Sequence, residues 1–170
     1  MSVSGGAGSG GENTETLMAF EAAATLKARY FRFMDLKQWD DWENLYAASA
    51  VMDMRGEAAW MGKLGMDVGD AEAWVLKSRA TIRESVSGAL EGVTTVHHGH
   101  MGEMEMIGPG RIRAIWAMED VIRYPQGRPI AGFNGYGHYH DTYVLEDGCW
   151  LIESVRLERL HLDPVPHTHS

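Results

Sequence analysis

The chain has 170 residues and only one cysteine, Cys149, so it cannot form an intramolecular disulfide. Basic residues are also scarce: 15 lysines and arginines stand against 24 acidic residues, a formal net charge of −9. Because phosphate binding requires clustered cations and no basic stripe is present, we expect no nucleic-acid partner. No apolar run approaches membrane-spanning length, and the N-terminus lacks the apolar core of a signal peptide. We therefore expect a cytoplasmic protein with no membrane partner.

What is present indicates a globular protein. The sequence is 45% hydrophobic and 23% charged, and its length predicts one domain. Residues 1–15 are rich in glycine and serine, which predicts a flexible tail. Residues 164–170 are predicted to form a loose C-terminal tail, so the single domain is placed at 16–163.

Helices are predicted in the first half of this domain. Apolar residues recur at helical spacing from Leu17 to Met34, after an expected helix start at Thr14 or Thr16. A turn and a second short helix are expected next. The remaining elements predicted in this half are a short strand over 50–55, a glycine-rich loop over 56–70 that covers a pocket, and a helix over about 70–90.

The second half predicts four long strands, separated by the turn signals GPG, YPQGRP and EDG. The predicted strands span residues 93–107, 111–124, 130–145 and 149–162. Helices followed by an antiparallel meander indicate an α+β fold, in which a curved sheet packed on a long helix encloses a cavity.

Two acids stand out. Asp35 follows the apolar run RYFRFM and precedes a turn, so it either reaches a pocket or caps a helix. Strand alternation places Trp116, Met118 and Asp120 on one face. If that face is inward, the Asp120 carboxylate needs an Arg, His or Tyr partner; the alternatives are a structural ion pair or an outward face.

The histidines cluster in HHGH, residues 97–100, and in HYH, residues 138–140. His97 and His98 point to opposite strand faces, so only one can enter a pocket. A neutral imidazole held by a carboxylate such as Asp35 is a ready general base. His138 and His140 share a face, which permits a metal site with His97 or His98 and a carboxylate, but there is no HExxH motif and no cysteine pair. We predict neither a metal nor a cofactor.

Several ordered motifs carry a family resemblance. The runs ARYFRFMDLKQWDDW, TTVHHGHMGEMEM, RAIWAMEDV and GYGHYHDTYVLEDGCWLIESVRLERL resemble the SnoaL-like branch of the NTF2-like superfamily. The resemblance covers roughly residues 18–163. It implies a cone-shaped, curved, mixed but mostly antiparallel sheet packed on N-terminal helices, the cystatin-like α+β barrel. The most similar pattern is that of the bile-acid-7α-dehydratase-like and dehydrochlorinase-like members.

This resemblance implies a set of catalytic residues: Tyr30, Asp35, His97, Asp120 and Arg159. His97 would abstract a proton beside an activated carbon, and Asp35 would orient it. Tyr30, or Asp120 with Arg159, would handle the leaving hydroxyl or the developing oxyanion. His98 is the alternative to His97. We assign substrate binding to His98, Tyr136, His138, His140 and Trp116.

The function predicted from these residues is a cofactor-independent lyase of the dehydratase type, or a related isomerase. Its substrate would be a bulky apolar molecule such as a steroid or polyketide. The alternative is a non-catalytic binder of small apolar or polycyclic molecules. The resemblance also implies a homodimer or homotrimer.

Overall fold

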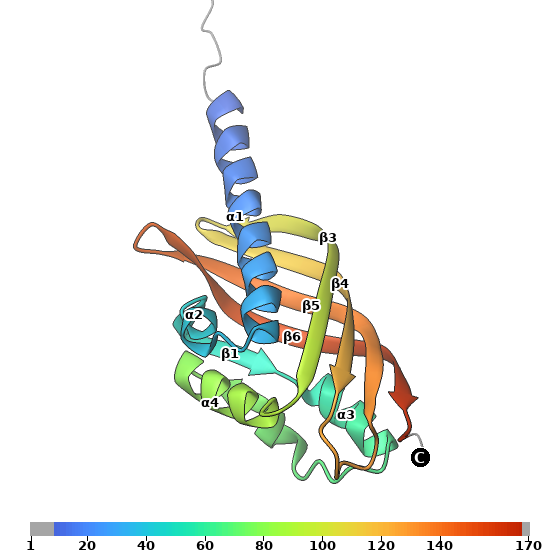
Figure 1. The fold of residues 1–170 in the computed structure, drawn as a ribbon. Helices are drawn as coiled ribbons and strands as arrows, with labels where there is room; N and C mark the ends of the chain where they lie inside the picture. Colours follow the sequence, from blue (N-terminus) through green and yellow to red (C-terminus); the bar gives the residue numbers. More distant parts are fainter. Residues whose placement is uncertain (1–8, 168–170) are drawn as a thin grey trace, which may run out of the picture.

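The computed structural model describes residues 9–167 (Figure 1). Its helices are α1 (Ser9–Asp35), α2 (Trp39–Glu43), α3 (Arg55–Lys63) and α4 (Arg79–Ala89), with a 3-10 turn η1 (Ala71–Trp74). Its strands are β1 (Tyr46–Asp53), β2 (Val75–Lys77), β3 (Thr94–Gly108), β4 (Arg111–Arg123), β5 (Gly132–Glu146) and β6 (Cys149–Val165). Among the described helices, none is long and apolar enough to cross a bilayer.

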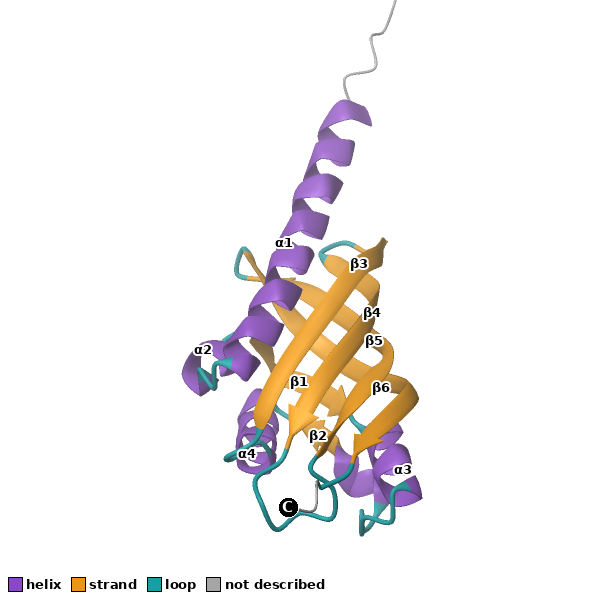
Figure 2. Cartoon of the chain, turned by 45° about the vertical axis from the view of Figure 1, so that its right-hand side comes forward, coloured by secondary structure: helices purple, strands orange, loops and turns teal. Residues whose placement is uncertain are grey.

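The strands form one sheet in the order β2-β1-β6-β5-β4-β3. All neighbouring pairs are antiparallel except β1 and β6, which are parallel. Figure 2 shows α1 lying across the hollow of the curved sheet, beside β3. The expected α+β class, with a mixed and mostly antiparallel sheet packed on N-terminal helices, is confirmed. The sheet does not close on itself, because β2 and β3 are both edge strands.

Helix α1 is held by one apolar stripe. Ala23, Leu26, Tyr30 and Met34 recur every three or four residues and are all buried against the sheet. The helix begins at Ser9, earlier than the predicted start at Thr14 or Thr16. No proline interrupts the segment, and extending an anchored helix costs far less than nucleating a new one. Of the predicted N-terminal tail, residues 1–8 lie outside the described part of the chain.

The loop predicted over 56–70 is wrong in its first half, which is helix α3. Gly56 does not mark flexibility there: a Cβ at this position would lie 2.3 Å from the Leu157 carbonyl oxygen, so the glycine lets α3 press on β6. Residues beyond Leu64 do form a loop up to η1.

The continuous helix predicted over about 70–90 is also wrong. The segment divides into η1, β2 and α4, because Val75–Lys77 pairs with β1 as an edge strand. Ser78 then starts α4 by accepting a hydrogen bond from the Thr81 amide. The four long strands agree with the predicted ranges to within a few residues. However, β6 extends to Val165, so it includes the start of the predicted C-terminal tail; residues 168–170 lie outside the described part.

Candidate active site

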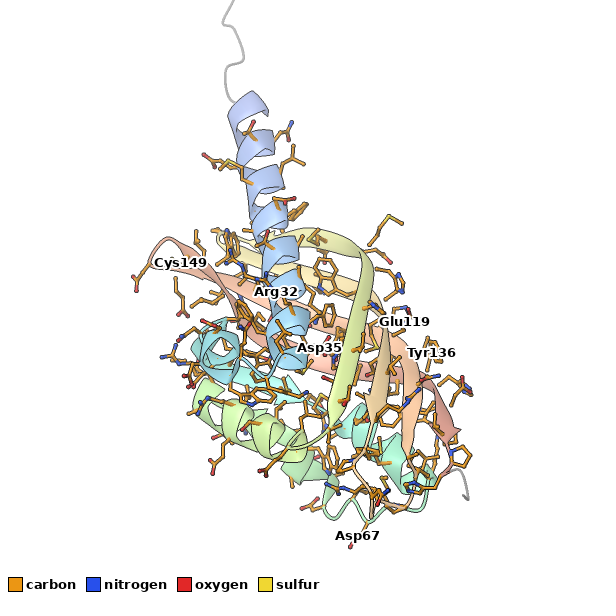
Figure 3. All side chains as sticks on the ribbon, viewed as in Figure 1. Arg32, Asp35, Asp67, Glu119, Tyr136 and Cys149 are labelled. Atoms are coloured by element: carbon orange, nitrogen blue, oxygen red, sulfur yellow. The ribbon has the colours of Figure 1, made fainter. Side chains whose placement is uncertain are left out.

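Asp35 and His97 are in direct contact. Asp35 is the last residue of α1, and Figure 3 shows it at the C-terminal end of that helix, next to β3. Its Oδ1 lies 2.6 Å from Nδ1 of His97, and its Oδ2 accepts a hydrogen bond from the His97 amide at 2.8 Å. The carboxylate therefore fixes both the backbone and the ring of His97, and it favours the tautomer with a proton on Nδ1.

A second strand residue completes the environment of Asp35. The Thr95 hydroxyl donates to Oδ1 at 2.8 Å, and Lys37 donates in turn to the Thr95 oxygen at 2.8 Å. Burial would raise the pKa of Asp35, but the hydrogen bonds and charge of His97, with the bond from Thr95, outweigh it and hold this pKa below its usual value. Asp35 is thus an ionised partner for the imidazole at neutral pH.

A buried ion-pair network lies on the other side of the imidazole. His97 Nε2 is 3.9 Å from Asp120 Oδ2. Arg159 holds Asp120 through two bonds, Nη1 to Oδ1 at 3.0 Å and Nη2 to Oδ2 at 2.5 Å. The exposed fractions of the Arg159 and Asp120 side chains are 3% and 1%. The predicted acid on the apolar face of β4 is therefore inward and paired.

Glu57 belongs to this network, although the sequence analysis missed it. Its Oε2 lies 2.5 Å from Nε of Arg159. Burial raises the pKa of Glu57, against the attraction of Arg159. Burial alone would lower the pKa of the Arg159 guanidinium. The carboxylates of Glu57 and Asp120 outweigh this effect and raise the pKa of Arg159. The available signal was helical spacing, since Glu57, Ala58 and Met61 form the buried face of α3.

Glycine in β5 makes room for the ion pair. Gly135 pairs with Asp120 across the ladder, and a Cβ on it would lie 2.2 Å from Arg159 Nη1 and 2.3 Å from Asp120 Oδ1. The guanidinium and carboxylate therefore occupy the space of a missing side chain. This gives the glycine-rich run of β5 a role in the site, beyond bending the strand.

Tyr30 lies in the aromatic interior behind the dyad. It is buried among Phe31, Trp42, Tyr46 and Tyr139, with ring centroids 5.5–6.3 Å away. Phe31, the next residue, stacks on the His97 ring at 6.0 Å. Burial, together with the charge of Asp141, raises the pKa of Tyr30, so its hydroxyl stays protonated.

A second polar cluster is buried in the same interior. Lys27 Nζ lies 2.9 Å from Asp141 Oδ2, with both side chains at most 2% exposed. Tyr143 donates to the same carboxylate oxygen at 2.8 Å, and Trp116 donates to the Tyr143 hydroxyl at 3.1 Å. Burial lowers the pKa of Lys27, although Asp141 opposes this. Trp116, a predicted substrate contact, thus belongs to the Lys27 cluster and not to the dyad.

The other four predicted substrate contacts lie on the outer face of the sheet. His98 lies on β3, and β5 contributes Tyr136, His138 and His140; all four alternate along their strands with residues that point inward. Figure 3 shows Tyr136 and Glu119 on the side of the sheet away from α1. His98 pairs with Glu119 at 3.3 Å, and His140 with Glu158 at 2.8 Å. The structure does not bring these four residues to the dyad, and it places His97, not His98, inside.

The same division bears on the metal alternative. His97 is inward while His138 and His140 are outward, and the outward His98 and His140 each pair with a glutamate, Glu119 and Glu158. Within residues 9–167, no group of three histidine, cysteine or acidic side chains is arranged to hold a metal ion.

Comparisons with known proteins identify the family of the chain. The SnoaL-like domain matches residues 15–156. The chain is 29% identical over 147 residues to the "Probable cyclase FGR4" of Gibberella zeae, covering 83% of this chain and 93% of that protein.

Solved structures share the fold at low identity. A "Putative Scytalone Dehydratase" of Novosphingobium aromaticivorans superposes with a TM-score of 0.70 at 16% identity, covering 93% of this chain and 99% of the other. A type 2 hexachlorocyclohexane dehydrochlorinase, LinA, superposes with a TM-score of 0.73 at 14% identity, covering 93% and 96%. With the domain match spanning most of the chain, the protein belongs to the SnoaL-like domain family.

Proposed function

We propose that the protein is a cofactor-independent lyase of the dehydratase type, or a related isomerase, acting on a bulky apolar alcohol or ketone. The observation that carries the proposal is the placement of His97 between two carboxylates. Asp35 binds Nδ1, and Asp120 lies 3.9 Å from Nε2. Relatives named as a cyclase, a dehydratase and a dehydrochlorinase support the same class of chemistry.

His97 acts as the general base in this mechanism. With its Nδ1 proton held by Asp35, the lone pair on Nε2 is available to take a proton from a carbon beside an activating group. The electron pair of that C–H bond forms the double bond. Asp35 then stabilises the imidazolium, because a carboxylate at 2.6 Å favours the charged ring.

The leaving hydroxyl needs a proton to depart as water. The imidazolium of His97 can return the proton that it has taken, so the elimination requires no external acid. Tyr30, which the family resemblance assigns to this step, keeps a protonated phenol because burial raises its pKa. Asp120, fixed by Arg159, contributes a stationary negative charge beside the imidazolium.

The chemistry of the surrounding walls supports an apolar or polycyclic ligand. Phe31 stacks on His97, and the rings of Tyr30, Trp42, Tyr46 and Tyr139 behind it are buried in the core. An aromatic neighbour such as Phe31 suits a flat, fused-ring substrate such as a steroid or polyketide intermediate.

Access is expected past the solvent side of Asp35. The exposed fraction of the Asp35 side chain is 20%, against 6% for His97. A surface depression of about 580 Å³ is lined by Lys37, Trp39 and the segment that leads into β3. Lys37 connects this depression to Asp35 through the Thr95 hydroxyl.

We also propose that the protein acts in the cytoplasm as a homodimer or homotrimer. The outer face of the sheet supports such assembly, since Val96, Tyr136 and Leu160 are 41%, 37% and 56% exposed there. Light scattering at several concentrations would measure the mass of the particle; a monomer throughout would contradict the proposal.

The alternative function is non-catalytic binding of the same class of small molecule. The low exposure of His97 and Asp120 favours it, because a base that substrate cannot reach does no chemistry. The direct contact of Asp35 with His97 favours catalysis instead.

The test uses variants of the dyad in a screen of polycyclic alcohols and ketones for alkene formation. His97→Ala and Asp35→Asn should lower turnover by about 10²–10⁴-fold and about tenfold or more, respectively, with native circular dichroism. His98→Ala is the matched control, because the neighbouring histidine points to the outer face. Turnover that persists in both dyad variants would contradict the mechanism, and binding without turnover by the unaltered protein would favour the binder.

A further inference from the structure

Arg159 is surrounded by carboxylates. Each of its three nitrogens faces an acidic oxygen: Nε faces Glu57, and Nη1 and Nη2 face Asp120. Its side chain is only 3% exposed. A guanidinium in this state has no edge left for the bidentate grip that arginine normally offers to a substrate carboxylate or phosphate.

A second buried cation of the interior, Lys27, is neutralised as well. Lys27 contacts Asp141, and its ammonium lies over the rings of Tyr139 and Tyr30, with centroids at 3.7 and 4.3 Å. The aromatic faces and the single carboxylate occupy its surroundings. Lys27 is therefore also closed to an incoming anion.

Around the dyad the balance of charge is negative. Asp35, Asp120 and Glu57 are three carboxylates, whereas Arg159 and the half-buried Lys37 are two cations. The proposed general-base step uses the neutral imidazole of His97, and in that state an anionic ligand would enter a site that has excess negative charge. The repulsion is strong because these groups are largely screened from water.

We propose that the site beside His97 admits uncharged ligands and rejects anions of the same shape, and that Glu57 sets this selectivity by occupying Arg159. This inference rests on the proposed function only in placing the ligand beside His97. It assigns the substrate to the neutral alcohols and ketones, and it excludes carboxylates and phosphate esters whose charge would lie at the dyad.

The role of Glu57 follows from where α3 meets β6. Gly56 packs on the Leu157 carbonyl, Trp60 donates to the Arg159 carbonyl at 3.1 Å, and Glu57 between them reaches the Arg159 guanidinium. The packing of helix α3 on β6 therefore fixes the Glu57 carboxylate beside the Arg159 guanidinium. Glutamine at this position has the same shape and can still accept a hydrogen bond from Nε, so Glu57→Gln removes the charge and leaves the packing.

The experiment compares two probes that differ in charge and not in outline, 2-naphthamide and 2-naphthoate, at pH 7. Binding is followed by NMR through the imidazole signals of His97, so that contacts elsewhere on the protein are not counted. The proteins are the unaltered chain, Glu57→Gln, and Glu103→Gln as a control that removes a carboxylate from the exposed side of β3.

The unaltered protein should bind the amide at least about tenfold more tightly than the carboxylate. Glu57→Gln should reduce this preference to within about threefold, mainly by improved binding of 2-naphthoate, while Glu103→Gln leaves it unchanged. Equal or tighter binding of 2-naphthoate by the unaltered protein would overturn the proposal.

The remaining outcomes also decide the matter. A preference that survives in Glu57→Gln would overturn the role of Glu57. If neither probe perturbs His97, the pocket is not a polycyclic site and the selectivity proposal fails. None of these readouts depends on turnover, so a failure of the lyase mechanism in the dyad variants would be seen separately.

Discussion

Replacing Gly135 with alanine is expected to break the buried pair between Arg159 and Asp120. The new methyl group would lie 2.2 Å from Arg159 Nη1 and 2.3 Å from Asp120 Oδ1. Ordinary contact distances exceed these by about 1 Å, so both side chains must move and the two parallel hydrogen bonds cannot survive together. The substitution removes no backbone hydrogen bond between β5 and β4.

The magnitude follows from the burial of the pair. Breaking a buried ion pair costs about 3–5 kcal/mol, and we expect the lower value, about 3 kcal/mol, because Arg159 keeps Glu57. For a chain of this length that corresponds to a fall in Tm of roughly 6–12 °C. The free energy of unfolding should be measured by urea titration, with tryptophan fluorescence as the probe.

The matched control is Gly88→Ala in α4. A Cβ on Gly88 meets no atom within 4 Å, so alanine there should be neutral or should stabilise the protein by up to about 1 kcal/mol. If Gly135→Ala is within about 0.5 kcal/mol of the unaltered protein while the control behaves as expected, the ion pair does not occupy the space over Gly135 and the description of the site is wrong.

Two further predictions concern the buried charges. Lys27→Met should lower the free energy of unfolding at pH 7 by about 3–5 kcal/mol, because it leaves the Asp141 carboxylate buried without its cation. The double change Lys27→Met with Asp141→Asn should recover part of that loss. Equal losses in the single and double variants would contradict a coupled pair. For Asp35, the pKa is lower in the folded protein than in the unfolded chain, so its stabilising contribution is complete above the unfolded value and is lost as the pH falls through the folded value. The unaltered protein should therefore lose stability more steeply than Asp35→Asn as the pH is lowered below about 4 in urea titrations, and parallel slopes would contradict the low pKa.

The fold was largely predictable because its strands carry strong local signals. Alternation in RIRAIWAMEDVIRY separates the two faces of β4, and the turn sequences mark the ends of the long strands. The segment from Arg55 to Lys77 was not predictable in the same way. The second residue of its helix, Gly56, is required by tertiary packing on Leu157, and β2 is a strand only because β1 offers it an edge.

The candidate site divides along similar lines. Strand parity placed Asp120 on one face with Trp116 and Met118, whereas the pairing of Asp35 with His97 was implied by the family resemblance. Glu57 could not be found this way, because its role depends on which face of α3 meets β6. His138 and His140 share a face as expected, but only the packing of α1 decides which side of the sheet is the inside.

The parallel pairing of β1 with β6 has a consequence for the order in which the protein folds. Tyr46 lies opposite Ile152, so β1 can pair with β6 only after most of the chain has been synthesised. Closing so long a loop is slow. The contact between Asp35 and His97 needs only α1 and β3, whereas Arg159 arrives with the last strand. During synthesis the dyad can therefore form while Asp120 and Glu57 still lack their cation, and the site becomes complete only when the C-terminal strand joins the sheet.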